Sequence, residues 1–184
     1  MSPRRIPRSC HPRVTAWTTV IQAHLPHLST PQATGLALWS LGMGLARSGA
    51  LTAVSAFLAT WLRRKEPAVR QPWRECCDEA TATRGTQRCA LAVEPCFVPL
   101  RRWVVDQWEG TPLALALEAT TLGTRLTVLA IRVVSRGCAI PGAWTVLAAT
   151  APQAWRREWW RMLRQGWRAV PRAWTVLVLA DRGL

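Results

Sequence analysis

Apolar residues recur at helical spacing through the first part of the chain. Residues 29–32, Ser-Thr-Pro-Gln, combine a hydroxyl cap, an early proline and a glutamine in the first turn, which predicts a helix start. The apolar spacing continues that helix to about Arg47 and predicts two more, over 51–62 and 97–108. Residues 66–95 are mixed and polar, which predicts a loop between helices.

The link between the first two predicted helices is short and contains Ser48 and Gly49. Two helices joined in this way form either a DNA-binding helix-turn-helix or a plain helical hairpin. In the hairpin, the basic end Arg63-Arg64-Lys65 is simply solvated. The pattern alone favours the hairpin.

The pattern changes from helix to strand at residues 109–112, Glu-Gly-Thr-Pro. Strand-like runs follow over 113–118, 125–134 and 138–147, then a helix over 153–168 and a last apolar run over 173–180. The expected fold class is α/β: a mixed β-β-β-α-β sheet whose last strand returns parallel to the first, preceded by an all-helical N-terminal region.

These changes divide the chain into three expected parts. Residues 1–28 form a basic disordered tail that is rich in proline at its start. Residues 29–110 form the helical region, which we expect to bind DNA, and residues 111–184 form the domain that contains the sheet.

The charge of the chain favours a polyanionic partner. There are 24 basic and 10 acidic residues, a formal net charge of +14, and Lys65 is the single lysine. Arginine matches phosphate oxygens with a planar fork, so DNA is the first expected partner and an anionic membrane surface the second. A GC-rich coding sequence would also raise the arginine content without any role in binding.

The apolar and cysteine content indicates a cytoplasmic protein with no membrane span. The most apolar window, 35–62, is interrupted by Arg47 and Ser48, which favours two short helices over one span. The start of the chain lacks the apolar stretch of a secretion signal. The six cysteines include no CxxC pair, and we expect free thiols rather than a zinc site.

Two acids stand at the ends of predicted strands. Glu118 closes the first predicted strand, and Asp181 closes the last. If these strands are parallel neighbours, the two carboxylates meet at one edge, where they could bind Mg²⁺ or Mn²⁺. Acids are also common at strand ends without any site, so both interpretations stay open at this point.

Three segments resemble the catalytic core of bacterial insertion-sequence transposases of the Asp-Asp-Glu type. These are Leu115–Gly123, Val128–Trp144 and Trp174–Leu184, and His24–Ala53 resembles the helical front part of the same proteins. The resemblance implies a partial RNase H-like fold in which Glu118 matches the first catalytic acid and Asp181 the second. It further implies Mg²⁺ or Mn²⁺ ions that activate water to nick DNA and a 3′ hydroxyl to join strands.

The chain departs from that family in two places. Glu118 stands where the family has aspartate, and the chain ends at Leu184, before a third acid. We therefore expect a transposase fragment that binds metal weakly and does not cut DNA. Its expected partners are DNA, a second copy of the chain or an intact transposase. The alternatives are a non-catalytic basic DNA-binding protein and a small membrane-associated protein.

The predicted helix after the third strand has two different faces. An apolar face, which we expect to pack on the sheet, carries Trp155, Trp159, Met162, Leu163 and Gly166. A basic face carries Arg157, Arg161, Arg164 and Arg168, which are either a solvated surface or a stripe that contacts DNA phosphates.

Overall fold

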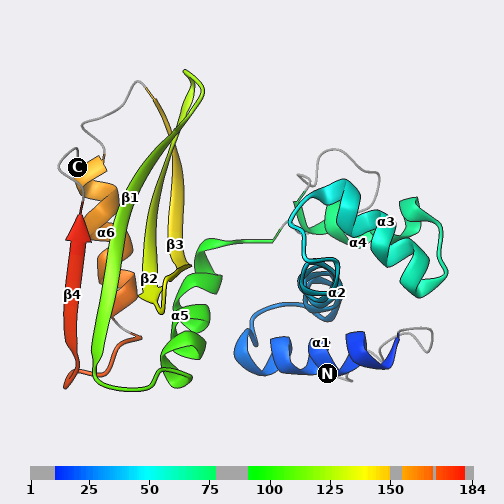
Figure 1. Ribbon diagram of the computed structural model, residues 1–184, viewed down its shortest axis with the longest axis horizontal. Helices are drawn as coiled ribbons and strands as arrows, with labels where there is room; N and C mark the ends of the chain where they lie inside the picture. Colours follow the sequence, from blue (N-terminus) through cyan, green and yellow to red (C-terminus); the bar gives the residue numbers. More distant parts are fainter. Residues whose placement is uncertain (1–10, 78–90, 150–154, 168, 181–184) are drawn as a thin grey trace. The chain divides into compact units, whose positions relative to one another are not determined.

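The chain folds as two units, residues 1–92 and 93–184, in the computed structural model (Figure 1). The structure describes residues 11–77, 91–149, 155–167 and 169–180. The first unit contains the helices α1 (Pro12–His24), α2 (Thr30–Ala46), α3 (Leu51–Leu62) and α4 (Glu66–Cys77). The second contains the short 3-10 helix η2 (Glu94–Cys96), the helices α5 (Phe97–Asp106) and α6 (Trp155–Trp167), and the strands β1 (Pro112–Leu122), β2 (Leu126–Ser135), β3 (Cys138–Ala148) and β4 (Thr175–Ala180).

Helix α2 begins at the predicted capping box. The Ser29 hydroxyl accepts from the backbone N–H of Gln32, and the Gln32 side chain accepts from the backbone N–H of Ser29 at 3.0 Å. The chain then bends by 96° between α2 and α3. Gly42 brings α2 close to α3, because a Cβ atom there would lie 2.8 Å from the buried Leu58 side chain.

Two helices occupy segments that the sequence pattern did not predict as helical. Helix α1 lies within the expected tail 1–28, and α4 lies within the expected loop 66–95, so both expectations are wrong for these residues. In α1 the buried stripe includes Thr18, whose hydroxyl donates to the Val14 carbonyl at 2.7 Å. A threonine on the buried face conceals the apolar periodicity, although its hydroxyl is satisfied within the helix.

No described helix by itself is long and apolar enough to cross a membrane. Helices α2 and α3 together are long and apolar enough, but a bend of 96° separates them.

The sheet of the second unit has the strand order β3-β2-β1-β4. The first three strands form an antiparallel meander, and β4 returns parallel to β1 after α6 (Figure 1). The second unit is thus a mixed α/β structure with the predicted β-β-β-α-β order, and most of the chain's helices precede it.

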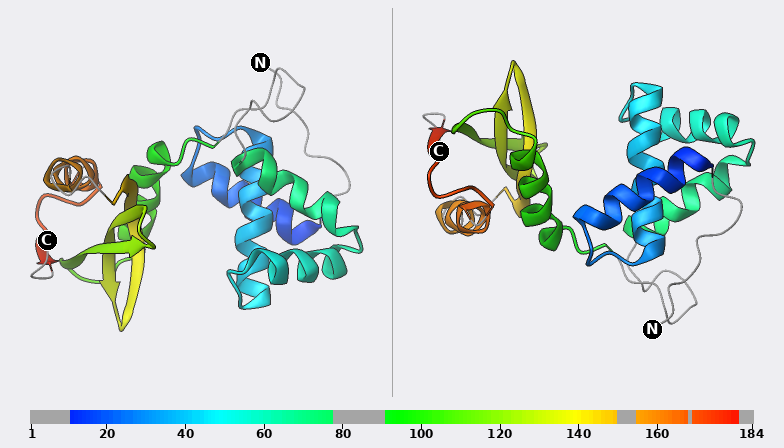
Figure 2. Two further views of the ribbon diagram at one scale, coloured as in Figure 1. Left: turned by 90° about the horizontal axis from the view of Figure 1, so that it is seen from above. Right: turned by 90° about the horizontal axis from the view of Figure 1, so that it is seen from below.

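Both helices of this unit cover the same face of the sheet, as the two views in Figure 2 show. Their core residues Phe97 on α5 and Trp159 and Met162 on α6 pack with Leu113 and Leu115 of β1. The core also contains Leu129, Ile131 and Val133 of β2 and Ala143 of β3. Because side chains alternate along a strand, the residues between these core positions lie on the opposite, open face.

Two boundaries differ from the prediction. The units divide between Ala92 and Val93 rather than at 110/111, because Phe97 of α5 is buried in the core of the sheet unit. Strand β1 continues to Leu122, which pairs with Leu126 of β2, so Glu118 lies inside the strand and not at its end.

Candidate functional site

Glu118 lies on the open face of the sheet and forms an ion pair with Arg132. Glu118 is paired with Ala130 in the β1–β2 register, and Arg132 is two residues further along β2. The Arg132 Nε lies 2.9 Å from the Glu118 Oε2, but its N–H is not aligned on that oxygen as a hydrogen bond. Both side chains are partly exposed, at 43% for Glu118 and 35% for Arg132. The ion pair is therefore screened by water.

The parallel pairing of β1 with β4 ends at Leu117 and Ala180 among the described residues. In the sequence, Leu117 is followed by Glu118, and Ala180 is followed by Asp181. The structure thus brings the residues before the two predicted acids into one register. Asp181 itself lies outside the described residues.

The metal centre that the resemblance implies needs Glu118 together with Asp181, and of these two residues the structure describes Glu118. Among the described residues, no three histidine, cysteine or acidic side chains lie close enough to hold a metal ion. The Glu118 carboxylate is paired with the guanidinium of Arg132. The positive charge of Arg132 opposes the binding of a divalent cation at Glu118.

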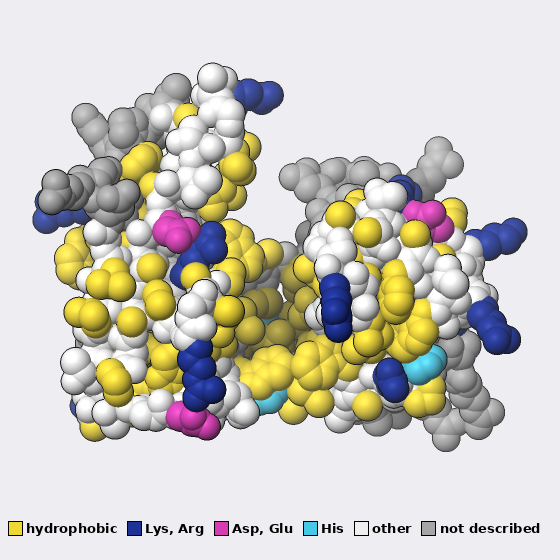
Figure 3. Space-filling view, in the orientation of Figure 1, with side chains coloured by type: hydrophobic (Ala, Val, Ile, Leu, Met, Phe, Trp, Pro, Cys, Tyr) yellow, Lys and Arg dark blue, Asp and Glu magenta, His cyan; other side chains and the backbone are white. Residues whose placement is uncertain are grey.

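The open face around this pair is apolar. Leu177 and Leu179 of β4 pair with Ala114 and Ala116 of β1, on the same face as Glu118. The two leucines are 57% and 46% exposed. Figure 3 views the sheet unit from this side and shows apolar side chains over β1 and β4.

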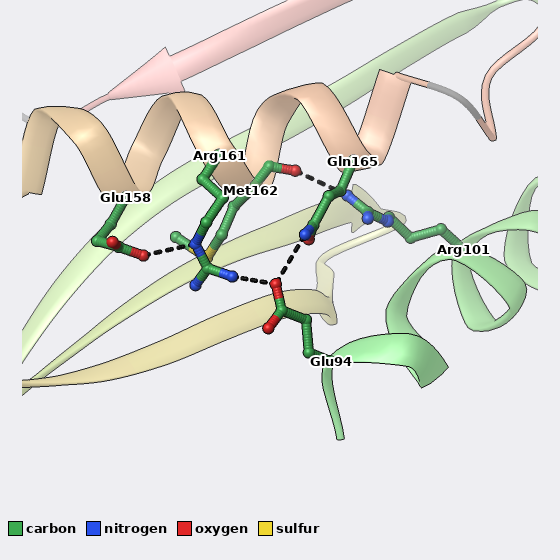
Figure 4. Close-up of polar contacts among 6 residues, drawn as sticks. All are labelled: Glu94, Arg101, Glu158, Arg161, Met162 and Gln165. Atoms are coloured by element: carbon green, nitrogen blue, oxygen red, sulfur yellow. Dashed lines mark hydrogen bonds and ion pairs between the residues drawn. The ribbon is translucent and has the colours of Figure 1, made fainter. Parts of the chain in front are cut away.

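The predicted arginine face of α6 separates into two kinds of residue. Arg157 and Arg164 are exposed, whereas Arg161 is held between two carboxylates (Figure 4). Its Nε donates to Glu158 at 2.7 Å, and its Nη1 pairs with Glu94. Arg168 lies outside the described residues.

The network at Arg161 joins α6 to the segment before α5. Gln165 donates from its Nε2 to the same Glu94 oxygen at 2.7 Å, as Figure 4 shows. The hydrogen bond from Gln165, together with Arg161, holds the pKa of Glu94 below its usual value. The hydrogen bond with Glu158 raises the pKa of Arg161, with a further contribution from Glu94. The positive charge of Arg161 is thus compensated within the protein.

An open hollow of about 650 Å³ lies along the outer side of α6. It is lined by Arg157, Trp160, Arg161, Arg164 and Gln165. Trp160 is 54% exposed and lies three residues after Arg157 and four before Arg164, so the three side chains share one side of the helix. The sequence analysis did not identify Trp160 as part of this surface, although its spacing from Arg157 and Arg164 can be read from the sequence.

No protein-family model, curated protein or solved structure matches this chain. The chemistry of its own residues is therefore the guide to its function.

The α2–α3 pair has the angle of a helix-turn-helix but few residues that could read bases. The bend of 96° lies in the usual range for that motif. However, the exposed positions of α3 are apolar or threonine: Leu51, Thr52, Ala53, Ala56 and Thr60. A recognition helix uses longer polar side chains to reach base edges. The basic residues Arg63, Arg64 and Lys65, directly after α3, remain as candidates for phosphate contact.

Proposed function

We propose that this chain is a DNA-binding relative of insertion-sequence transposases of the Asp-Asp-Glu type, and that it does not cut the DNA that it binds. The observation that carries the relationship is the parallel register of Leu117 with Ala180, the residues that precede Glu118 and Asp181. A meander followed by a crossover to a strand beside the first is also the topology that a partial RNase H-like sheet requires.

The loss of cleavage follows from the surroundings of Glu118. The resemblance implies aspartate at this position, and glutamate carries its carboxylate one methylene further from the strand. A displacement of about 1 Å in a catalytic group costs about a hundredfold in rate. In addition, Arg132 pairs with this carboxylate and opposes its use as a metal ligand. Both features point to a protein that keeps the fold but not the reaction.

DNA binding is supported by charge and by the outer side of α6. The net charge of +14 attracts phosphates at long range. Arg157 and Arg164 line an exposed hollow where a phosphate backbone can reach them, whereas Arg161 is already paired with Glu158 and Glu94. The three arginines should therefore contribute unequally to binding.

The direct test is a fluorescence anisotropy titration of the whole chain onto a labelled DNA duplex at several salt concentrations. We expect an affinity that falls linearly with salt on logarithmic axes, because phosphate contacts release counterions. The absence of measurable binding at about 50 mM salt, where such contacts are strong, would overturn the proposal. Titration of a terminal-repeat duplex beside an unrelated one tests whether the binding distinguishes sequences.

A further inference from the structure

Arg101 of α5 is a buried cation without a carboxylate partner among the described residues. Its side chain is held between α5 and α6, and the residue is only 5% exposed. Its Nε donates to the Phe97 carbonyl at 3.2 Å. Its Nη1 donates to the Met162 carbonyl, also at 3.2 Å, as Figure 4 shows. Its Nη2 is buried and has no hydrogen-bond partner in the part of the chain that the structure describes.

A buried charge of this kind is costly unless it is paired. Burial lowers the pKa of Arg101 to about 10, so the guanidinium still carries its charge at neutral pH. The two carbonyl oxygens supply hydrogen bonds but no negative charge. The arrangement therefore leaves the Nη2 amino group and one full positive charge to be satisfied.

Two glycines make the space for this side chain. A Cβ atom on Gly166 of α6 would collide with the Arg101 Nη1, and one on Gly142 of β3 would lie 3.3 Å from the Arg101 Cδ. Gly142 stands at the bulge where the β2–β3 register shifts. A larger residue at either glycine position would therefore collide with the Arg101 side chain or press against it.

A small cavity of about 20 Å³ is lined in part by the Arg101 side chain. Its other walls are apolar side chains and the two glycines: Leu115, Ile131, Val133, Leu163 and Val170, with Gly142 and Gly166. A cavity of this size holds one water-sized particle. Phosphate, sulfate and carboxylate groups are larger than this space.

We propose that this cavity binds one halide ion, chloride in the cell, against the Arg101 guanidinium. A halide supplies the missing negative charge and accepts from the unpartnered Nη2. A halide ion fits a space for a single particle. Because a halide is weakly hydrated, moving it between apolar walls costs less free energy than moving a strongly hydrated anion there. This proposal does not depend on the proposed DNA-binding function.

The test is thermal unfolding of the whole chain in mixtures of sodium chloride and sodium gluconate at constant ionic strength. We expect the melting temperature to rise with chloride, by about 3 to 5 °C for each tenfold increase above the dissociation constant. Bromide should replace chloride, and gluconate is too large to do so. A melting temperature that is independent of the anion overturns the proposal and leaves water as the occupant.

Three variants locate the effect. Arg101→Met removes the charge, and Val133→Ile fills the cavity without changing Arg101; both should lose the chloride response. Arg102→Met, at the exposed neighbouring position, should keep it. If Arg101→Met fails to fold, Val133→Ile still decides. A chloride response that survives in Val133→Ile places the ion elsewhere and overturns the assignment.

Discussion

The Arg132 guanidinium lies diagonally across the β1–β2 pair from Glu118, with its Nε 2.9 Å from the Glu118 Oε2. A cation from the protein therefore stands beside the carboxylate that a catalytic metal ion would need. Coulomb repulsion between Arg132 and a divalent cation disfavours metal binding at this carboxylate.

Replacement of Arg132 by alanine is expected to strengthen the binding of Mn²⁺, which can be measured by electron paramagnetic resonance of the free ion. Exposed ion pairs contribute at most about 1 kcal/mol, so the gain should be no more than about fivefold. Arg136→Ala is the matched control, because it removes an exposed ion pair with Glu109 at 3.0 Å. Equal Mn²⁺ affinity in the two variants would argue against a role for Arg132.

The arginines of α6 should contribute unequally to DNA affinity. The double variant Arg157→Ala, Arg164→Ala is expected to weaken binding and to reduce the salt slope by about 2, since each phosphate contact contributes about 0.9. Arg161→Ala should change the slope less, because Glu158 and Glu94 already neutralise this residue. Arg156→Ala is the control: it is exposed on α6 but does not line the hollow. If Arg156→Ala weakened DNA binding as much as the double variant, the hollow would not be the site of phosphate contact.

The stability of the sheet unit should depend on pH through Glu94. Its pKa in the folded state is lowered by Gln165 and Arg161, so its contribution is present above the unfolded value of 4.5 and is lost as the pH falls through the folded pKa. Glu94→Gln should lower the melting temperature at pH 7 and flatten its decline below 4.5. Glu109→Gln, at an exposed ion pair, serves as the control. An identical decline in Glu94→Gln and the natural protein would contradict this assignment.

Two glycine substitutions should have opposite effects on stability, because one glycine is packed against Arg101 and the other faces open space. Gly166→Ala forces its methyl group into the buried guanidinium and should destabilise the fold by about 1 to 3 kcal/mol. Gly44→Ala, where nothing lies within 4 Å in helix α2, should stabilise by about 0.5 to 1 kcal/mol. Urea denaturation measures both. A neutral Gly166→Ala would show that Arg101 can move aside.

Strand β4 should promote self-association. It pairs on one side with β1 in the described sheet, and Leu177 and Leu179 are exposed. Edge strands with apolar side chains readily pair with other chains. The double variant Leu177→Lys, Leu179→Lys should reduce the weight-average mass in sedimentation velocity. A natural chain that sediments as a single monomeric species would refute this expectation.

The sequence predicted the elements whose local chemistry agrees with their packing. Ser29 and Gln32 marked the start of α2 because a capping box is a local interaction. The β-branched and apolar runs likewise marked β1 to β4, although β1 extends beyond the predicted end at Glu118 to Leu122. The order of these runs sufficed to predict the parallel return of β4.

Residues whose role depends on contacts across the fold were not predictable in this way. The pairing of Glu118 with Arg132 requires the β1–β2 register, which the sequence does not specify by itself. Arg101 had one indication, since Phe97, Arg101 and Val105 recur every four residues on the buried side of α5. An arginine at such a position is normally interpreted as surface, because few charged residues are fully buried.

One measurement tests most directly whether the chain binds DNA and leaves it intact. The whole chain is incubated with a labelled duplex at low salt in Mg²⁺ or Mn²⁺, bound DNA is isolated, and its strands are separated on a denaturing gel. We expect the bound DNA strands to be uncut. Metal-dependent nicking that disappears in Glu118→Ala would contradict this expectation.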